Sequence, residues 1–200
     1  MASKIIVDQL QKSGYTALTL PSANATANQI LKNDGAGALS WSADAGAPPK
    51  IGQVLQATKT DTFTTAAAVW TDITDLSIAI TPTLATSKIL VFMNVNGIGV
   101  AGASGAWVKI VRDSTSIAIG DAAGSRQQAS NANYDSDAGS STPFSTVWID
   151  EPATTSAVTY KVQGFAQTTN TLYVNRTEAD SDAVGYARTV STITVMEYLI

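Results

Sequence analysis

From residue 51 to residue 200 the chain is a succession of short apolar segments, separated by turn residues and without a convincing helical period. Residues 76–80, Leu-Ser-Ile-Ala-Ile, alternate large and small side chains, which is typical of a half-buried strand. The run 88–95 is the most apolar, and its short length and β-branched residues favour a central strand over a helix. Regularly spaced short strands with Gly and Asn turns predict an all-β fold, a jelly-roll-like antiparallel β-sandwich over 51–200.

Other segments fit the same pattern. Further strands are expected at 54–58, 69–73, 107–112, 116–119, 144–149, 158–167, 171–175 and 189–198. Asp113-Ser114-Thr115 predicts a tight hairpin turn. The run 97–102 spaces its glycines as in the phosphate-binding pattern G-x-G-x-x-G, but no helix follows to supply an anion-binding terminus. We therefore predict a turn there.

Residues 1–46 differ from the rest, because their short apolar pieces are interrupted by Gly, Pro and Asn. The run 33–37, Asn-Asp-Gly-Ala-Gly, predicts a hairpin turn. So few large apolar groups cannot form an independent core, so this hairpin-rich segment needs a partner surface. Two consecutive prolines favour an extended spacer, which places a linker at 47–50 between the segment 1–46 and the domain 51–200.

Composition excludes several functions. The chain has no cysteine and no histidine, which excludes disulfides, thiolate zinc sites and Ser-His-Asp triads. A formal net charge of −4 argues against nucleic acid as a partner. Charged residues make up only 14%, while 45 of 200 residues are Ser or Thr, so the expected surface is polar with little charge. We expect a binding or structural protein, not an enzyme.

No cofactor or metal is expected either. Asp135 and Asp137, like Asp180 and Asp182, have the Asp-x-Asp spacing that could ligate Ca²⁺, but the further ligands of a calcium loop are missing. Solvated turn carboxylates are the simpler interpretation, and a calcium-dependent lectin is the alternative. No run of about 18 apolar residues indicates membrane insertion. The first eight residues lack the apolar core of a signal peptide, so synthesis in the cytoplasm is expected.

The polar stretch 121–142 interrupts the regular spacing of the strands. Long loops within a compact domain are uncommon and are functional or disordered. A mobile surface loop is one interpretation; a ligand-facing loop is the other, since its donors and flat side chains suit sugars or proteins. The candidate receptor contacts are Arg126, Gln127, Gln128, Tyr134, Asp135 and Asp137. Trp70, Trp107 and Trp148 lie inside expected strands, where burial is the default expectation.

Several phrases of the sequence resemble the fibre-type structural proteins of tailed bacteriophages, especially those of marine bacteria. At the amino end these are MASKIIVDQLQKSG at 1–14, TALTLP at 16–21 and ANQILKNDGAGALSW at 27–41. Later phrases are TPTLATSKILV at 81–91, GDAAGSR at 120–126 and TSAVTYKVQG at 155–164. Together they span most of the chain.

This resemblance implies a homotrimeric virion appendage that is docked to other virion proteins, of tail or capsid, through residues 1–46. The β domain would project outward and adsorb to a host surface glycan or protein. Three copies of the segment would bury apolar groups that one copy cannot. The implied attachment and trimer contacts are Ile5, Ile6, Val7, Leu10 and Trp41.

Two alternatives stay open at this point. The segment 1–46 of a monomer would fold back onto its own β domain. The chain would also suit a capsid decoration or head-fibre protein that strengthens the particle without binding a receptor, since no long shaft separates its two parts.

Overall fold

The computed structural model describes residues 9–11, 13–14, 16–43, 50–66, 68–100, 104–135, 137, 139–167 and 170–200. The chain divides into two compact units, Met1–Pro48 and Pro49–Ile200. Residues 47–49 of the predicted linker lie outside the described residues. No helix occurs in the described part of the chain, so none there could cross a membrane.

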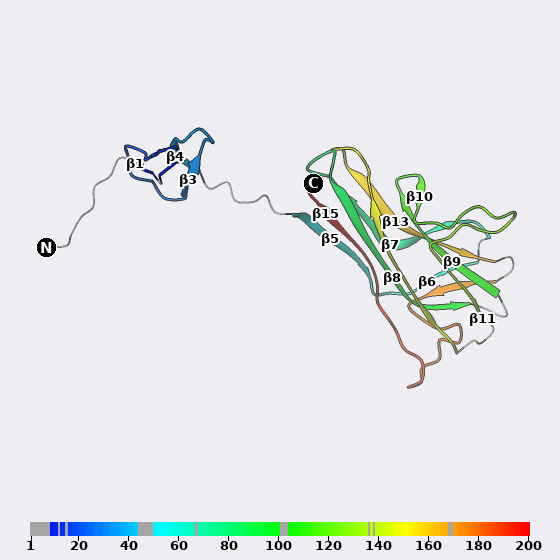
Figure 1. Cartoon of the computed structure of the whole chain (residues 1–200). Coiled ribbons are helices and arrows are strands. Elements are labelled where there is room, and N and C mark those ends of the chain that lie inside the picture. The colour runs from blue at the N-terminus through cyan, green and yellow to red at the C-terminus, as the bar shows by residue number, and fades with distance from the viewer. Residues whose placement is uncertain are drawn as a thin grey trace. The chain divides into compact units, whose positions relative to one another are not determined.

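The second unit is built from two antiparallel sheets (Figure 1). The first sheet contains β5 (Ile51–Lys59), β15 (Ser191–Tyr198), β8 (Lys88–Val100) and β12 (Thr142–Asp150). The second contains β7 (Thr71–Ile80), β13 (Val158–Ala166), β9 (Ser104–Arg112) and β11 (Asn131–Asp135). Short strands extend the two sheets: β6 (Phe63–Thr65) and β14 (Leu172–Val174) in the first, and β10 (Thr115–Ile117) in the second.

The order of these strands is that of a jelly roll. Within the first sheet the pairing order is β5-β15-β8-β12, and within the second it is β7-β13-β9-β11. The chain therefore crosses between the sheets after β6, β7, β8, β11, β12 and β13, and remains in the second sheet from β9 to β11. Two interleaved Greek keys have this connectivity. The predicted fold class, an all-β antiparallel sandwich, is confirmed.

The core is formed by buried side chains that occur at every second position along the strands. On β8, Ile89, Val91, Met93 and Val95 are fully or almost fully buried, while the residues between them are partly exposed or exposed. The facing strands contribute Val108, Ile110, Tyr160 and Val162 from β9 and β13. Because successive side chains point to opposite faces of a sheet, each sheet also presents an outer face, and these two faces hold the sites described below.

Two expected strands at 69–73 and 76–80 are one strand, β7. Ile73 and Leu76 are both buried although they are three residues apart, and Asp75 between them has φ of 65°. The pairing with β13 shifts at this position. A β-bulge therefore restores the alternation in the second half of the strand, and two short strands were the wrong interpretation.

The predicted turn at 97–102 is also wrong in its first part, because β8 continues to Val100. A side chain at Gly97 would lie 2.8 Å from the Arg176 backbone nitrogen, and one at Gly99 would lie 3.0 Å from that of Glu178. These glycines therefore serve close packing of the chain after β14 against β8, and not a turn. Residues 101–103 lie outside the described residues.

The stretch 121–142 is not a continuous loop. Residues 131–135 form β11, which pairs antiparallel with β9 from Asn131 opposite Val108 to Asp135 opposite Ser104. The polar sequence has no strand periodicity, because β11 lies at the edge of the sheet, where several of its side chains face solvent.

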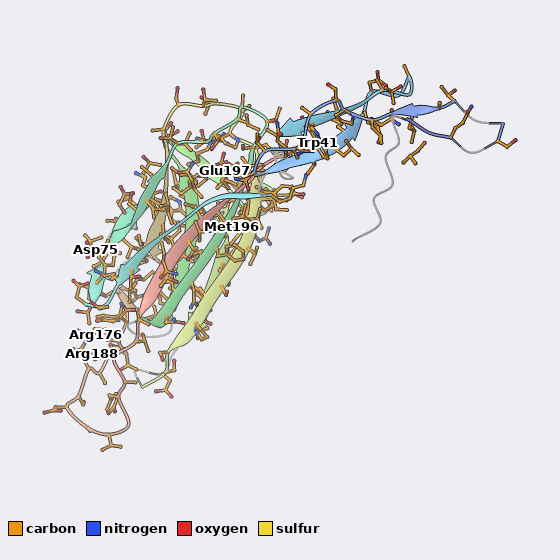
Figure 2. The ribbon with its side chains drawn as sticks, turned by 90° about the vertical axis from the view of Figure 1, so that its left-hand side faces the viewer. Trp41, Asp75, Arg176, Arg188, Met196 and Glu197 are labelled. Carbon is orange, nitrogen blue, oxygen red and sulfur yellow. The ribbon has the colours of Figure 1, made fainter. Side chains whose placement is uncertain are left out.

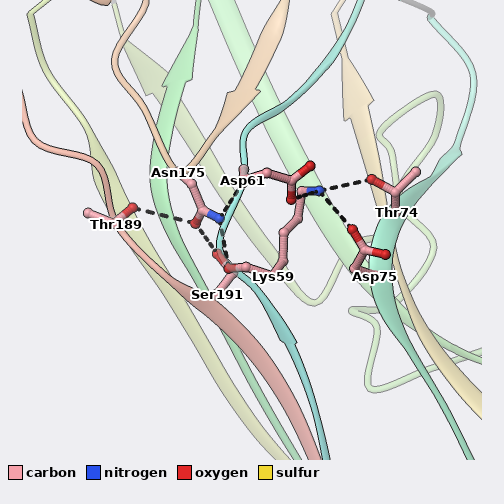
Figure 3. A network of polar contacts seen from close by, with 7 residues as sticks. All are labelled: Lys59, Asp61, Thr74, Asp75, Asn175, Thr189 and Ser191. Atoms are coloured by element: carbon pink, nitrogen blue, oxygen red, sulfur yellow. Dashed lines mark hydrogen bonds and ion pairs between the residues drawn. The ribbon is translucent and has the colours of Figure 1, made fainter.

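A polar network fixes one end of the second unit (Figure 3). The buried ammonium of Lys59 donates to Asp61 at 2.7 Å and to the Thr74 hydroxyl at 2.9 Å, and it lies 3.4 Å from Asp75. Asn175, with φ of 62°, donates through Nδ2 to the carbonyls of Lys59 and Asp61. These contacts connect β5, β7 and the segment after β14, so we assign the network a structural role.

The first unit is small. β1 (Gln9–Leu10) pairs with β2 (Leu18–Thr19), and β3 (Gln29–Asn33) pairs with β4 (Leu39–Ala43). The hairpin between β3 and β4 turns at the predicted residues, where the Asp34 carboxylate accepts the N–H groups of Ala36 and Ala38. These backbone hydrogen bonds lower the pKa of Asp34.

Candidate functional site

Three aromatic rings gather on the outer face of the second sheet. Trp107 on β9 lies opposite Phe165 on β13, and their ring centroids are 5.3 Å apart in an edge-to-face arrangement. Trp70, just before β7, lies 5.4 Å from Phe165 on its other side. Phe165 is 8% exposed, while Trp70 and Trp107 are half-buried. The outer face thus offers apolar ring surface to solvent at Trp107.

Gly105 determines how Trp107 lies. A side chain at Gly105 would come within 2.7 Å of the Trp107 ring, so the ring covers the backbone two residues before it. The Gly105 N–H donates to Oε1 of Gln167 at 3.1 Å, and the Gln167 N–H donates to the Gly105 carbonyl at 3.0 Å. Gln167 is therefore held at the rim of the Trp107 ring by two hydrogen bonds.

The segment between β10 and β11 covers the same area. Residues of this segment and of the sheet enclose a pocket of about 260 Å³, which we call the aromatic pocket; it is lined by Trp107, Ser125, Arg126, Gln127, Phe165 and Gln167. The segment is fixed by its own contacts: Gly120 donates to the Ala129 carbonyl, and Ser130 donates to the Val108 carbonyl at 2.9 Å. The pocket is thus built from a sheet and an anchored segment.

Two cationic side chains lie at this face. Arg126 donates to the carbonyl of Ala123, and no carboxylate of the described residues pairs with its guanidinium. Lys109 lies with its ammonium 4.4 Å from the Trp70 ring centroid, a cation–π contact. Burial lowers the pKa of the Lys109 ammonium. Hydrogen-bond donors therefore flank the rings on both sides.

The predicted receptor contacts divide into two groups. Arg126 and Gln127 line the aromatic pocket, and Tyr134 on β11 lies opposite Gly105 and is 69% exposed. Gln128 instead donates back to the Gly120 carbonyl at 2.7 Å.

The two remaining predicted contacts lie farther along the chain. Asp137 is exposed, and its Oδ1 accepts the Gly139 N–H at 2.8 Å in the turn after β11. Asp135 ends β11. The structure therefore brings Arg126, Gln127 and Tyr134 to one face, whereas Gln128 and Asp137 do not line the pocket; the side chain of Asp135 lies outside the described part of the structure.

The predicted attachment residues belong to the first unit. Ile5, Ile6 and Val7 lie outside the described residues. Leu10 is 53% exposed and lines a hollow of about 430 Å³ beside the β3–β4 turn. Trp41 is partly buried within its own unit, where its indole N–H donates to the Ala23 carbonyl at 2.7 Å.

A larger hollow of about 620 Å³ lies at the end of the second unit, beside Asn96, Gly97 and Thr189. None of the described residues that line it is aromatic, and its cation, Arg188, already pairs with Asp180 at 2.8 Å. Figure 2 places Arg188 beside Arg176 at this end. Among the described residues, no group of three or more carboxylates could hold a metal ion. The aromatic pocket is therefore the better candidate for a ligand.

Sequence reasoning missed Phe165 and Gln167 and treated Trp107 only as a core residue. The alternation on β9 does place Trp107 on the face opposite Val108 and Ile110, and this signal could have indicated a half-exposed ring. The expected burial of Trp148 is wrong: the side chain is 44% exposed, because β12 is an edge strand.

No protein-family model and no curated protein sequence match the chain. Among solved structures, the chain is similar to a structure of infectious bursal disease virus, Gx strain, at 14% identity and a TM-score of 0.31. It is also similar to the VP2 subviral particle of that virus, at 12% identity and a TM-score of 0.28. In both, 94% of this chain matches 50% of the other, so the chain spans half their length. TM-scores this low do not establish a shared fold.

Proposed function

We propose that the chain is a structural protein of a bacteriophage virion, a homotrimeric tail fibre or short fibre appendage. Residues 1–46 attach it to the particle, and the jelly-roll unit binds a glycan of the host surface in the aromatic pocket. The binding role is supported by the lining of the aromatic pocket, which combines two aromatic rings with polar side chains: Trp107, Phe165, Arg126, Gln127 and Gln167. The resemblance to fibre-type proteins supports the virion role.

The chemistry of the pocket suits a sugar. The apolar C–H faces of a pyranose ring pack on aromatic rings, and the half-buried Trp107 offers such a surface. Planar amides and a guanidinium can each make two hydrogen bonds with neighbouring hydroxyls, and Gln127 and Arg126 bring these groups to the rim. The pocket, at about 260 Å³, is slightly smaller than common drug-sized sites of roughly 300–1,000 Å³. It would take one sugar residue of a longer chain.

A single small site of this kind binds weakly. Three linked copies that meet one polysaccharide raise the overall affinity by about 10²–10⁴-fold without any new contact. The proposed trimer therefore matches the proposed ligand, a repeating surface glycan. A decoration protein without a receptor would need no such pocket.

The binding role is tested with the full chain on an array of bacterial surface polysaccharides. We expect a subset of these glycans to bind, and we expect Trp107→Ala and Arg126→Ala to weaken that binding about tenfold or more, as loss of a stacking or charged contact predicts. Arg188→Ala, an exposed arginine outside the pocket, is the matched control. Binding that survives both pocket variants, or no binding at all, would contradict the role.

The virion role is tested by labelling the chain with a specific antibody on intact particles and imaging them. Label at the tail together with pocket-dependent adsorption supports the fibre. Label on the capsid with adsorption unchanged in the Arg126→Ala particle would instead indicate a decoration protein. Absence of the chain from particles would remove the virion role altogether.

A further inference from the structure

The outer face of the first sheet carries an apolar patch that continues across all four strands. On β8, Leu90 and Phe92 point away from the core, since Ile89, Val91 and Met93 point into it. The strand registers place outward side chains of the neighbouring strands beside them. One row is Val54, Met196, Leu90 and Ile149; the next is Gln56, Thr194, Phe92 and Val147. Figure 2 shows these strands side by side, with Met196 labelled on β15.

Exposure within the patch is high. Val54 is 55% exposed, Val147 is 58% exposed and Ile149 is 56% exposed. Leu90 and Phe92 are only partly covered. Apolar groups placed together in this way on a sheet face mark an interaction surface, whereas single exposed apolar residues do not.

The patch contains no charged side chain. A third row, Thr58, Thr192, Asn94 and Ser145, continues the face with uncharged polar groups. On the other side of the patch the next row of the same face is Ile51, Tyr198 and Lys88, and the Lys88 ammonium pairs with Glu151 at 2.6 Å, so its charge is compensated. Hydroxyls and amides both donate and accept hydrogen bonds, so such groups can pair with copies of themselves. An acidic chain with this neutral face can meet its own copy there without repulsion.

We propose that this face, which we call the β5–β12 face, is where a second copy of this chain docks. The inference rests on the homotrimer proposed above and assigns it a surface outside the segment 1–46. The aromatic pocket lies on the opposite sheet, so the assembly leaves it open to ligand.

The area of the face favours a ring over a dimer. Four strands about 4.8 Å apart and three rows about 7 Å apart cover roughly 400 Å². A stable interface buries about 800 Å² of each partner, so two copies joined face to face would bury only half of that. In a ring, each copy uses its face towards one neighbour and another surface towards the second, and it buries both.

The edge strand β12 supplies that second surface. Trp148 is 44% exposed and points to the side of this strand opposite Val147 and Ile149, which belong to the β5–β12 face. An edge that is apolar on both sides is covered best when it lies against the face of another copy. Contact of an edge with a face joins unlike surfaces, and such contacts form a closed ring when the rotation between neighbouring copies closes, as it does in the homotrimer proposed above.

The test is the mass of the full chain in solution by sedimentation equilibrium. We expect three times the chain mass of 20.7 kDa for the wild-type protein. In the double variant Val147→Lys and Ile149→Lys, two charges are buried without partners in the contact, and we expect the dissociation constant to rise roughly 100-fold or more. Gln56→Lys places one charge on the same face at an exposed polar position and should act in the same direction.

Val184→Lys is the matched control, because Val184 is fully exposed in the segment between β14 and β15, away from the β5–β12 face. Thermal unfolding of each variant verifies that the fold persists. A monomeric wild-type protein would overturn the proposal, as expected if residues 1–48 of the same chain covered the face. A trimer that persists in both face variants would also overturn it and would assign trimerisation to residues 1–46.

The two proposals fail separately. If the face variants lose the trimer, this inference stands. If Arg126→Ala binds the glycan as well as wild type does, the receptor role is refuted. Binding of a single short glycan depends on the aromatic pocket alone, so the face variants should retain it.

Discussion

The hydroxyl of Tyr160 donates to the Asp150 carboxylate at 2.7 Å, and this bond joins the two sheets of the jelly roll, since Tyr160 lies on β13 and Asp150 on β12. Arg112 on β9 donates to the same carboxylate oxygen at 2.7 Å. Burial first, and then the Asp150 carboxylate, raise the pKa of the Tyr160 phenol, and the hydrogen bond to Asp150 raises the pKa of Arg112. Tyr160 therefore remains a neutral donor throughout the ordinary pH range.

Tyr160→Phe should lower the free energy of unfolding by about 1.5–3 kcal/mol, the usual contribution of a hydrogen bond to a charged group. Asp150 retains Arg112 in this variant, so the fold should persist. Denaturant unfolding measures the loss, and Tyr198→Phe, at a 37% exposed position, is the matched control expected to change stability by less than about 0.5 kcal/mol. Equal stability of the two variants would mean that Tyr160 contributes through packing alone.

The carboxyl group of Glu197 should make the stability of the protein depend on pH. Burial raises the pKa of its carboxyl group, but hydrogen bonds from the Thr83 N–H, the Gln53 amide and the Thr83 hydroxyl together bring it below its ordinary value. A lowered folded-state pKa stabilises the protein above the unfolded value of about 4.5, and this contribution is lost as the pH falls through the folded value.

Glu197→Gln should therefore cost about 1–3 kcal/mol at pH 7 and less below pH 4.5, so that the wild-type and variant curves converge in acid. Unfolding free energies measured from pH 3 to pH 7 give both curves. Glu151→Gln is the control, since its side chain is 67% exposed. A difference between wild type and Glu197→Gln that stays constant with pH would exclude the carboxylate as its cause.

The strands of the sandwich could be predicted because alternation is local. Ile89, Val91, Met93 and Val95 repeat every two residues, and a single face of a sheet needs nothing else to be recognised. The jelly-roll pairing, by contrast, connects β5 with β15 across nearly the whole unit. The sequence indicates this pairing only through the number and spacing of its expected strands. The glycines of β8 were misread because their reason, the close approach of residues 175–178, lies far away in the sequence.

The candidate site could be predicted only in part for the same reason. Arg126, Gln127 and Tyr134 were found because a long polar stretch between strands is unusual. Phe165 and Gln167 belong to an ordinary strand and its end, and only the pairing of β13 with β9 brings them to Trp107. A sequence alone does not show which two strands will be neighbours.

Substitution of Asn175 should have a large effect on the free energy of unfolding. Its Oδ1 accepts the Ser191 hydroxyl at 2.6 Å, and its Nδ2 donates to two backbone carbonyls, in a left-handed conformation that asparagine tolerates (Figure 3). Asn175→Ala should cost roughly 3 kcal/mol, because buried groups lose their partners and alanine is strained at this φ. Asn175→Gly relieves the strain alone, so it should be more stable than Asn175→Ala by about 1 kcal/mol. Chemical denaturation of both variants separates the two causes, and an unchanged Asn175→Ala protein would refute the structural role of the network.

Gly105 provides a way to move the Trp107 ring without removing it. In Gly105→Ala the new methyl group would lie 2.7 Å from the ring, so the ring must shift and the Gln167 amide beside it must follow. We expect binding of the array-selected glycan to weaken at least about fivefold, since stacking depends on ring position. Gly120→Ala is the matched control, because no atom lies within 4 Å of its added methyl group and it belongs to the same covering segment. Isothermal titration of the full chain measures both, and equal affinity of Gly105→Ala and Gly120→Ala would show that the ring of Trp107 does not contact the glycan.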